Sequence, residues 1–176
     1  MSVEWNKANK WTQDDFAAFV QQYSDVLIRY AFCMVPDSAA CEEIVLQAIA
    51  TYVYRNSDRA LGKAYLYRIV RNRCIDYIRR HRRMVPLQDV ECVLDGGFVV
   101  EDHAEHEERD RILYRCLGRL AKDYRTVLYL QLEGFGVQDT CRIMGKNAKQ
   151  VYNLLARAKV ALKEELLKEG IDDEDL

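Results

Sequence analysis

Apolar residues recur at intervals of three and four along most of the chain, and this spacing is the feature that most restricts the fold. It is clear in residues 16–31, where the apolar positions are Phe16, Phe19, Val20, Tyr23, Leu27, Tyr30 and Ala31. The 176 residues include only eight Gly and two Pro, which argues against an all-β or collagen-like chain. We therefore predict an all-α protein built from two small helical domains.

Cap and turn signals divide this pattern into separate helices. A capping-box pattern at residues 12–15 opens a first helix, which we expect to end near Pro36. Asp37 offers the next N-cap, for a helix to about residue 54, and a third helix is expected at about 60–83. Residues 84–106 contain Pro86 and a Gly-Gly pair without any sustained period, which is typical of a linker. Further helices are predicted at about 107–119, 122–133, 137–144 and 148–168.

The net charge of −2 conceals alternating blocks of charge. Residues 55–83 carry +8 and residues 112–163 carry +7, whereas residues 1–54, 84–111 and 164–176 carry −4, −7 and −6. Two basic modules suggest two contacts with a polyanion, with the acidic segments kept off it by repulsion, although any helical protein has charged faces. We place the domains at 1–84 and 107–170, with an acidic linker at 85–106 and an acidic tail at 171–176.

In the third predicted helix, apolar and cationic side chains separate onto opposite arcs. Leu66, Val70, Cys74 and Tyr77 share the apolar arc. The opposite arc carries Arg68, Arg71, Asn72, Asp76, Arg79 and Arg83. Arg73 breaks the pattern, because it falls on the apolar arc, where its stem would have to snorkel to reach water.

Residues 137–154 have the spacing of a helix-turn-helix. Cys141 would face the partner helix, Gly145 would lie at the turn, and Asn147 would cap a second helix that packs through Val151 and through Leu154 or Leu155. Its exposed residues, suited to phosphates and base edges in a major groove, would be Lys149, Gln150, Tyr152, Asn153 and Arg157. An ordinary helical hairpin is the alternative for this segment taken alone.

Other classes of function find little support in the sequence. The six cysteines contain no C-x-x-C pair, so we expect free, mostly buried thiols, with a redox sensor or scattered metal ligands as the alternative. Residues 102–107 could be imagined as a metal site, but they lie in the predicted linker, and the chain has no P-loop, dinucleotide-binding or nucleophile-elbow motif. We expect no cofactor, no metal, no membrane insertion and a cytoplasmic location.

Two stretches resemble the extracytoplasmic-function sigma factors of the sigma-70 family. Residues 64–80, AYLYRIVRNRCIDYIRR, are close to the family's AWLYRIARNxxxDYxRR, and residues 120–128, LAKDYRTVL, stand ahead of the Glu133-Gly134 pair and the helix-turn-helix. Residues 16–83 therefore resemble the family's region 2, and residues 113–166 its region 4. The resemblance implies a dissociable specificity subunit of bacterial RNA polymerase, without catalysis of its own.

The resemblance also implies a role for particular residues. Contacts with the clamp helices of the polymerase β′ subunit would come from Glu42, Glu43, Ile44 and Gln47. The minus-10 element would be opened and held, with help from the turn at residues 56–58, by Tyr65, Tyr67, Arg68, Arg71, Asn72, Asp76, Arg79 and Arg80. The minus-35 element would be read by Asn147, Lys149, Gln150, Tyr152, Asn153 and Arg157. The β flap of the polymerase and an anti-sigma factor are further implied partners.

Two departures from the family's pattern keep other interpretations open. Leu46-Gln47 replaces a polar Gln-Glu pair at the implied polymerase contact, and the second helix of the helix-turn-helix lacks two of the family's cations around Tyr152. A sigma-like accessory protein or a helix-turn-helix regulator that does not initiate transcription is therefore the alternative. Each implied tyrosine and arginine contact also has a simpler interpretation, as a core tyrosine or a solvated arginine.

Overall fold

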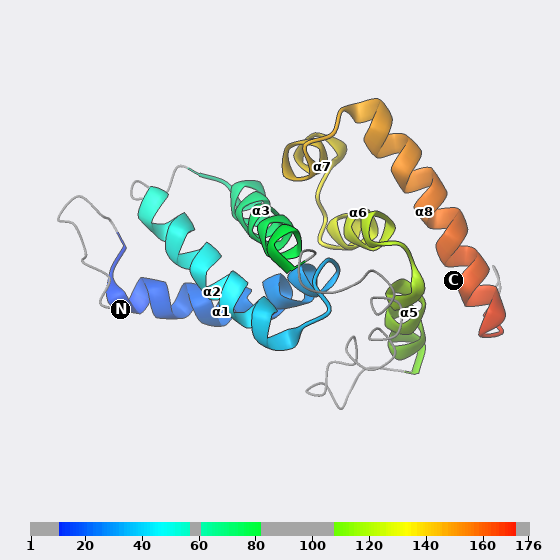
Figure 1. The fold of residues 1–176 in the computed structure, drawn as a ribbon, viewed down its shortest axis with the longest axis horizontal. Coiled ribbons are helices and arrows are strands. Elements are labelled where there is room, and N and C mark those ends of the chain that lie inside the picture. The colour runs from blue at the N-terminus through cyan, green and yellow to red at the C-terminus, as the bar shows by residue number, and fades with distance from the viewer. Residues whose placement is uncertain (1–10, 57–60, 82–107, 172–176) are drawn as a thin grey trace.

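The computed structural model describes residues 11–56, 61–81 and 108–171, which form α-helices with no β-strand among them (Figure 1). In chain order the helices are α1 (Gln13–Phe32), α2 (Ser38–Arg55), α3 (Lys63–His81), α5 (Glu108–Arg119), α6 (Lys122–Leu132), α7 (Val137–Met144) and α8 (Ala148–Lys168). The predicted all-α fold is therefore confirmed. The predicted linker and acidic tail, Cys92 and the cluster at 102–107 lie outside the described residues.

The predicted caps form at the helix starts. The Thr12 hydroxyl oxygen accepts a hydrogen bond from the Asp15 backbone N–H at 3.1 Å, and the Asp15 carboxylate accepts one from the Thr12 N–H at 2.9 Å. This reciprocal pair is a capping box. At the start of α2, the Asp37 carboxylate accepts a hydrogen bond from the Ala40 N–H at 3.0 Å. Local sequence is sufficient to place both of these helix starts.

Some helix ends differ from the predicted positions. Helix α1 ends at Phe32, ahead of the expected Pro36, where the chain tightens into a turn and the Met34 N–H bonds to the Ala31 carbonyl, three residues back, at 2.9 Å. Helix α3 begins only at Lys63, directly after Gly62, a residue that disfavours helix. The bounds of α7 and α8 agree with the prediction.

Each end of the chain packs its helices around buried apolar stripes. Helix α1 packs against α2 and α3, and α2 packs against α3, while α8 contacts α5, α6 and α7. Leu66, Val70 and Cys74, on the predicted apolar arc of α3, are at most 1% exposed. The arc therefore faces the interior, which leaves the cationic arc of the same helix at the surface.

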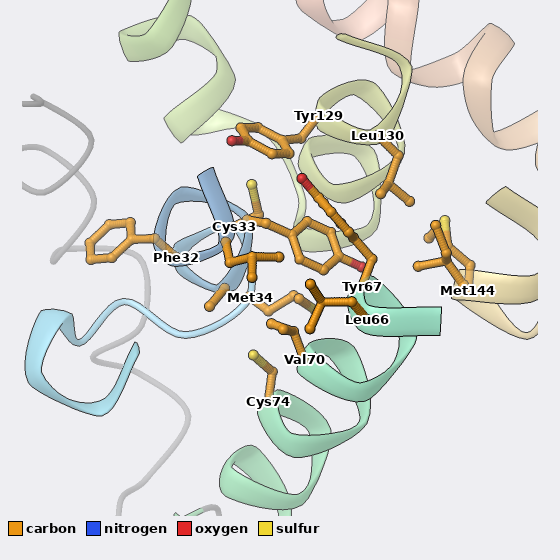
Figure 2. Packing of buried hydrophobic residues seen from close by; sticks show 14 of the residues in the cluster. Phe32, Cys33, Met34, Leu66, Tyr67, Val70, Cys74, Tyr129, Leu130 and Met144 are labelled. Atoms are coloured by element: carbon orange, nitrogen blue, oxygen red, sulfur yellow. The ribbon is translucent and has the colours of Figure 1, made fainter. Parts of the chain in front are cut away.

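The two halves of the chain also pack against each other. Helix α3 contacts α7, and the buried side chains of α1, α2, α3, α6, α7 and α8 belong to one apolar cluster. Figure 2 shows Tyr67 of α3 in this cluster, together with Cys33 near the end of α1, Tyr129 and Leu130 of α6 and Met144 of α7. The exposed surface of each half therefore depends on which of its side chains the other half covers.

Candidate functional site

The cationic arc of α3 forms an open surface. Arg68, Asn72, Asp76, Arg79 and Arg80 are exposed, and Arg71 is half-buried. Within this set of described residues, an ion pair joins Arg79 to Asp76 at 3.7 Å, and both side chains are more than half exposed. Such an exposed pair contributes little stability, so the guanidinium groups stay accessible to an anionic ligand. The structure thus brings together most of the residues predicted for the minus-10 element.

The two tyrosines predicted beside these arginines have different positions. At 100° per residue, Tyr65 lies on the arc of Asn72 and Asp76, whereas Tyr67 lies close to Cys74 on the inner arc. Tyr65 is half-buried, and its hydroxyl oxygen accepts a hydrogen bond from Arg55 at 3.1 Å. Tyr67 is 0% exposed. In this arrangement the Tyr67 side chain lies between the two halves of the chain, where DNA cannot reach it.

A carboxylate from the second half of the chain holds Tyr67 in place. Glu133, in the turn after α6, accepts a hydrogen bond from the Tyr67 hydroxyl at 3.1 Å and lies 3.4 Å from the Lys63 ammonium. Burial and this carboxylate raise the pKa of Tyr67, so the hydroxyl stays protonated as a donor. The Lys63 ammonium also lies 5.3 Å from the ring centre of Phe135. These residues join the start of α3 to the turn between α6 and α7.

Arg125 makes a second link between the halves. Its side chain is buried, and its guanidinium donates to the backbone carbonyls of Cys33 at 3.1 Å, Gly118 at 2.8 Å and Leu120 at 2.6 Å. These carbonyls lie at the carboxyl ends of α1 and α5, where backbone acceptors lack partners within the helix. Burial lowers the pKa of Arg125, although its ordinary value is so high that it remains charged at neutral pH. One cation therefore caps two helix ends from different halves.

The helix-turn-helix geometry of α7 and α8 is present. Gly145 adopts a positive φ of 64°, the left-handed conformation that a helix-ending glycine accommodates without strain. The Asn147 side chain then accepts a hydrogen bond from the Gln150 backbone N–H at 2.9 Å and starts α8. Val151 and Leu155 are buried, as predicted.

The residues predicted to read the minus-35 element lie together on the free side of α8. Asn147, Lys149, Gln150, Tyr152, Asn153 and Arg157 are all exposed. Tyr152 has 61% of its surface accessible. Because Val151 and Leu155 hold the opposite face, these six side chains are available to a groove of duplex DNA.

The predicted polymerase contact on α2 is only partly at the surface. Glu42, Glu43 and Gln47 are exposed, and the Gln47 amide donates to the Glu43 carboxylate at 2.9 Å. Ile44 is only 7% exposed, because the apolar stripe of α2 directs its side chain into the core, which leaves little of it available to a partner. Leu46, one of the two residues that replace the family's polar pair, is 55% exposed on this surface.

The turn between α2 and α3 is held by Asn56, which was expected to help with DNA. Its side chain is 2% exposed, accepts a hydrogen bond from the Leu61 N–H at 2.7 Å and donates to the Leu61 carbonyl at 3.3 Å. The Asn56 carbonyl accepts a hydrogen bond from the Trp11 indole at 2.8 Å. Asn56 therefore shapes the turn, and residues 57–58 lie outside the described part of the chain.

The cysteines give no sign of a metal or redox site in the described residues. Cys33, Cys41, Cys74 and Cys116 are buried and Cys141 is half-buried, all as free thiols. Burial raises the pKa of Cys33 and of Cys41 to about 12. The residues with described positions hold no group of three or more His, Cys, Asp or Glu suited to a metal ion, and no helix among them is long and apolar enough to cross a bilayer.

Comparison with known proteins assigns both halves of the chain to one family. Residues 19–84 match Sigma-70 region 2, and residues 110–162 match Sigma-70, region 4. The chain therefore belongs to the sigma-70 family, as a sigma factor of the extracytoplasmic-function type. It directs promoter-specific transcription, with core RNA polymerase and promoter DNA as its partners. Proteins of this family are not enzymes.

Individual relatives resemble the chain over most of their length. The ECF RNA polymerase sigma factor SigM of Bacillus subtilis is 27% identical over 160 residues, 88% of this chain and 96% of SigM. The RNA polymerase sigma-E factor of Streptomyces coelicolor is 29% identical over 164 residues, 90% of this chain and 89% of that factor.

Two solved structures share the fold. The sigma factor RpoE, solved in complex with the anti-sigma factor NepR from Bartonella quintana, gives a TM-score of 0.68 at 22% identity, covering 87% of this chain and 97% of RpoE. CnrH, solved in complex with the cytosolic domain of CnrY, gives a TM-score of 0.59 at 18% identity, covering 93% of this chain and 94% of CnrH. Both similarities extend across the two halves of the chain.

Proposed function

We propose that this sigma factor initiates transcription through three surfaces on two domains. In this proposal, residues 1–84 and 107–170 are the domains, joined by the acidic linker 85–106 and followed by the acidic tail 171–176. The chain acts in the cytoplasm, as a dissociable subunit without its own catalysis. The observation that carries the proposal is the exposed cationic arc of α3 in the same chain as an exposed recognition helix, α8.

The first surface, the cationic arc of α3, is proposed to hold the opened minus-10 element. Strand separation needs cations along a backbone and polar or aromatic side chains that receive an unstacked base. Arg68, Arg71, Arg79 and Arg80 supply the cations, and Asn72, Asp76 and Tyr65 lie beside them. Tyr67 contributes only in an arrangement in which α6 and α7 have moved away from α3.

The second surface, on α8, is proposed to read the minus-35 element as duplex. Asn147 and Gln150 cap each other at the start of α8, so their remaining hydrogen-bonding groups lie where a recognition helix enters the major groove. Lys149 and Arg157 are suited to phosphates, and Tyr152 and Asn153 to base edges. With only two cations, this surface is expected to bind DNA with a shallow salt dependence.

The third surface, Glu42, Glu43 and Gln47 on α2, is proposed to dock on the clamp helices of the polymerase β′ subunit, with the β flap as the contact of the second domain. An anti-sigma factor is a further proposed partner. The similar structure of RpoE is a complex with the anti-sigma factor NepR, and that of CnrH is a complex with the cytosolic domain of CnrY. To test this, products of genes neighbouring this one can be added to a transcription assay. One of them is expected to suppress initiation, and no effect from any of them would contradict the proposal.

Strand opening distinguishes this function from that of a helix-turn-helix regulator. Promoter fragments selected from genomic DNA with core polymerase are probed with permanganate, which attacks unpaired thymines. The Arg71→Ala, Arg79→Ala double variant is expected to lose thymine reactivity at the minus-10 element while keeping minus-35 duplex binding. A Lys149→Ala, Asn153→Ala variant is expected to lose duplex binding first. Duplex binding by the unaltered chain without any opening would instead support the regulator.

A further inference from the structure

Arg73 lies in a position that neither the core nor the DNA surface explains. Arg73 lies on the inner arc of α3, yet its guanidinium is not bound by water alone, because it contacts side chains of α2. One terminal nitrogen donates to the Gln47 side-chain oxygen at 2.8 Å, and the other donates to the Thr51 hydroxyl oxygen at 2.8 Å. These distances are typical of charge-assisted hydrogen bonds.

The bond from Arg73 sets the orientation of the Gln47 amide. Because the Gln47 oxygen faces Arg73, the Gln47 nitrogen faces Glu43 and donates to its carboxylate at 2.9 Å. The Thr51 hydroxyl also donates to the Gln47 backbone carbonyl at 2.8 Å. A free glutamine on a helix surface would sample several rotamers, and ordering it on binding would cost conformational entropy. Arg73 removes much of this freedom before any partner arrives.

The same arginine lies in the groove between the two proposed binding surfaces of the first domain. This groove, about 370 Å³ in volume, is lined by Glu43 and Gln47 from α2 and by Arg73, Asp76 and Arg80 from α3. Glu43 and Gln47 belong to the proposed polymerase surface, and Asp76 and Arg80 to the proposed minus-10 surface. Arg73 therefore connects the two helices that carry these surfaces.

We propose that Arg73 is a positioning residue for polymerase binding. It preorganises Gln47, and through it Glu43, in the orientation that core polymerase recognises. This inference rests on the proposed polymerase surface of α2. It assigns to Arg73 no contact with polymerase or DNA.

The test compares the affinity of purified core RNA polymerase for fluorescently labelled full-length variants. Arg73→Met keeps the length of the side chain but removes its donors, and it is expected to weaken binding about three- to tenfold, the effect of freeing one or two ordered side chains. Arg73→Lys keeps a charge but cannot donate to Gln47 and Thr51 in the same geometry, so it should weaken binding less than Arg73→Met does. Arg115→Met is the matched control. It removes an arginine that joins α5 to α8 through Glu169 at 3.1 Å, and it should leave the affinity unchanged.

A double-mutant cycle shows whether Arg73 acts through Gln47. In the Gln47→Ala variant, adding Arg73→Met is expected to cause no further loss of affinity for core polymerase. Equal losses from Arg73→Met with and without Gln47→Ala would overturn the inference, as would unaltered binding by Arg73→Met when Gln47→Ala binds weakly.

Two further outcomes separate this inference from the proposals on which it rests. If Arg73→Met lowers the melting temperature and weakens minus-35 duplex binding to the same extent as polymerase binding, Arg73 only supports the fold and the inference fails. If Gln47→Ala and Glu43→Ala both bind core polymerase as tightly as the unaltered chain, the proposed α2 surface itself is wrong.

Discussion

Replacing Arg125 with methionine is expected to destabilise the protein strongly. The side chain is 6% exposed, and three backbone carbonyls, those of Cys33, Gly118 and Leu120, accept hydrogen bonds from its guanidinium. Methionine fills a similar length without donors, so Arg125→Met leaves these helix-end carbonyls without that partner. A change confined to packing between side chains of similar volume would usually cost less than about 1.5 kcal/mol.

The expected magnitude follows from the burial of these groups. A buried acceptor that loses its donor costs about 1–3 kcal/mol, so three such acceptors set an upper range of several kcal/mol. Part of this is recovered because the charged guanidinium no longer has to be desolvated, the same cost that lowers the pKa of Arg125. We expect a net loss of about 3 kcal/mol in the free energy of unfolding. For a chain of this size, that corresponds to a fall of about 6–12 °C in melting temperature.

Urea unfolding followed by far-UV circular dichroism measures this loss. Arg115→Met is the control, because the Arg115 side chain is 48% exposed and its ion pair with Glu169 should contribute less than about 1 kcal/mol. If Arg125→Met unfolds within about 1 kcal/mol of the unaltered chain, the three carbonyls do not depend on Arg125 and the reasoning is refuted.

Other predictions concern a buried hydroxyl, the thiols and the recognition helix. The buried Tyr30 hydroxyl has no hydrogen-bond partner among the described residues, so Tyr30→Phe should raise the free energy of unfolding by about 1 kcal/mol in urea titrations, and a loss of stability would contradict this. Burial raises the pKa of Cys33 and Cys41 to about 12, so at pH 8.5 both should react with a thiol reagent only after denaturation, and rapid labelling of the native protein would argue against this burial. The pKa of each thiol is higher in the folded than in the unfolded protein. The free energy of unfolding should therefore fall as the pH rises from about 9 towards 12. Lys149→Ala should make the slope of log K against log salt for duplex DNA shallower by about 0.9, and an unchanged slope would mean that Lys149 contacts no phosphate.

The sequence predicted the features that depend on local chemistry. Thr12, Asp37 and Asn147 cap their helices through side chains that bond within three residues, and Gly145 permits the turn through its own backbone. Helical periodicity likewise separated the buried and exposed arcs of α3. These features need no knowledge of the rest of the fold.

The contacts between the two halves of the chain were not predictable in the same way. Arg125 and Cys33 are separated by 92 residues, and Tyr67 and Glu133 by 66, and no local pattern pairs such positions. The family resemblance implies a DNA contact for Tyr67, with a core tyrosine as the alternative, and only the packing of the second half against α3 shows that its side chain is buried. Arg73 was recognised as an exception on its arc, but only the positions of Gln47 and Thr51 on α2 account for it.

Run-off transcription tests the central claim most directly. Purified core RNA polymerase from the source organism is combined with the chain on genomic promoter templates, and an artificially opened template confirms that the core is active. The account predicts discrete transcripts that depend on the chain and disappear in the Arg71→Ala, Arg79→Ala double variant. No transcript from any genomic template, while the core transcribes the opened template, would contradict the claim that this chain initiates transcription.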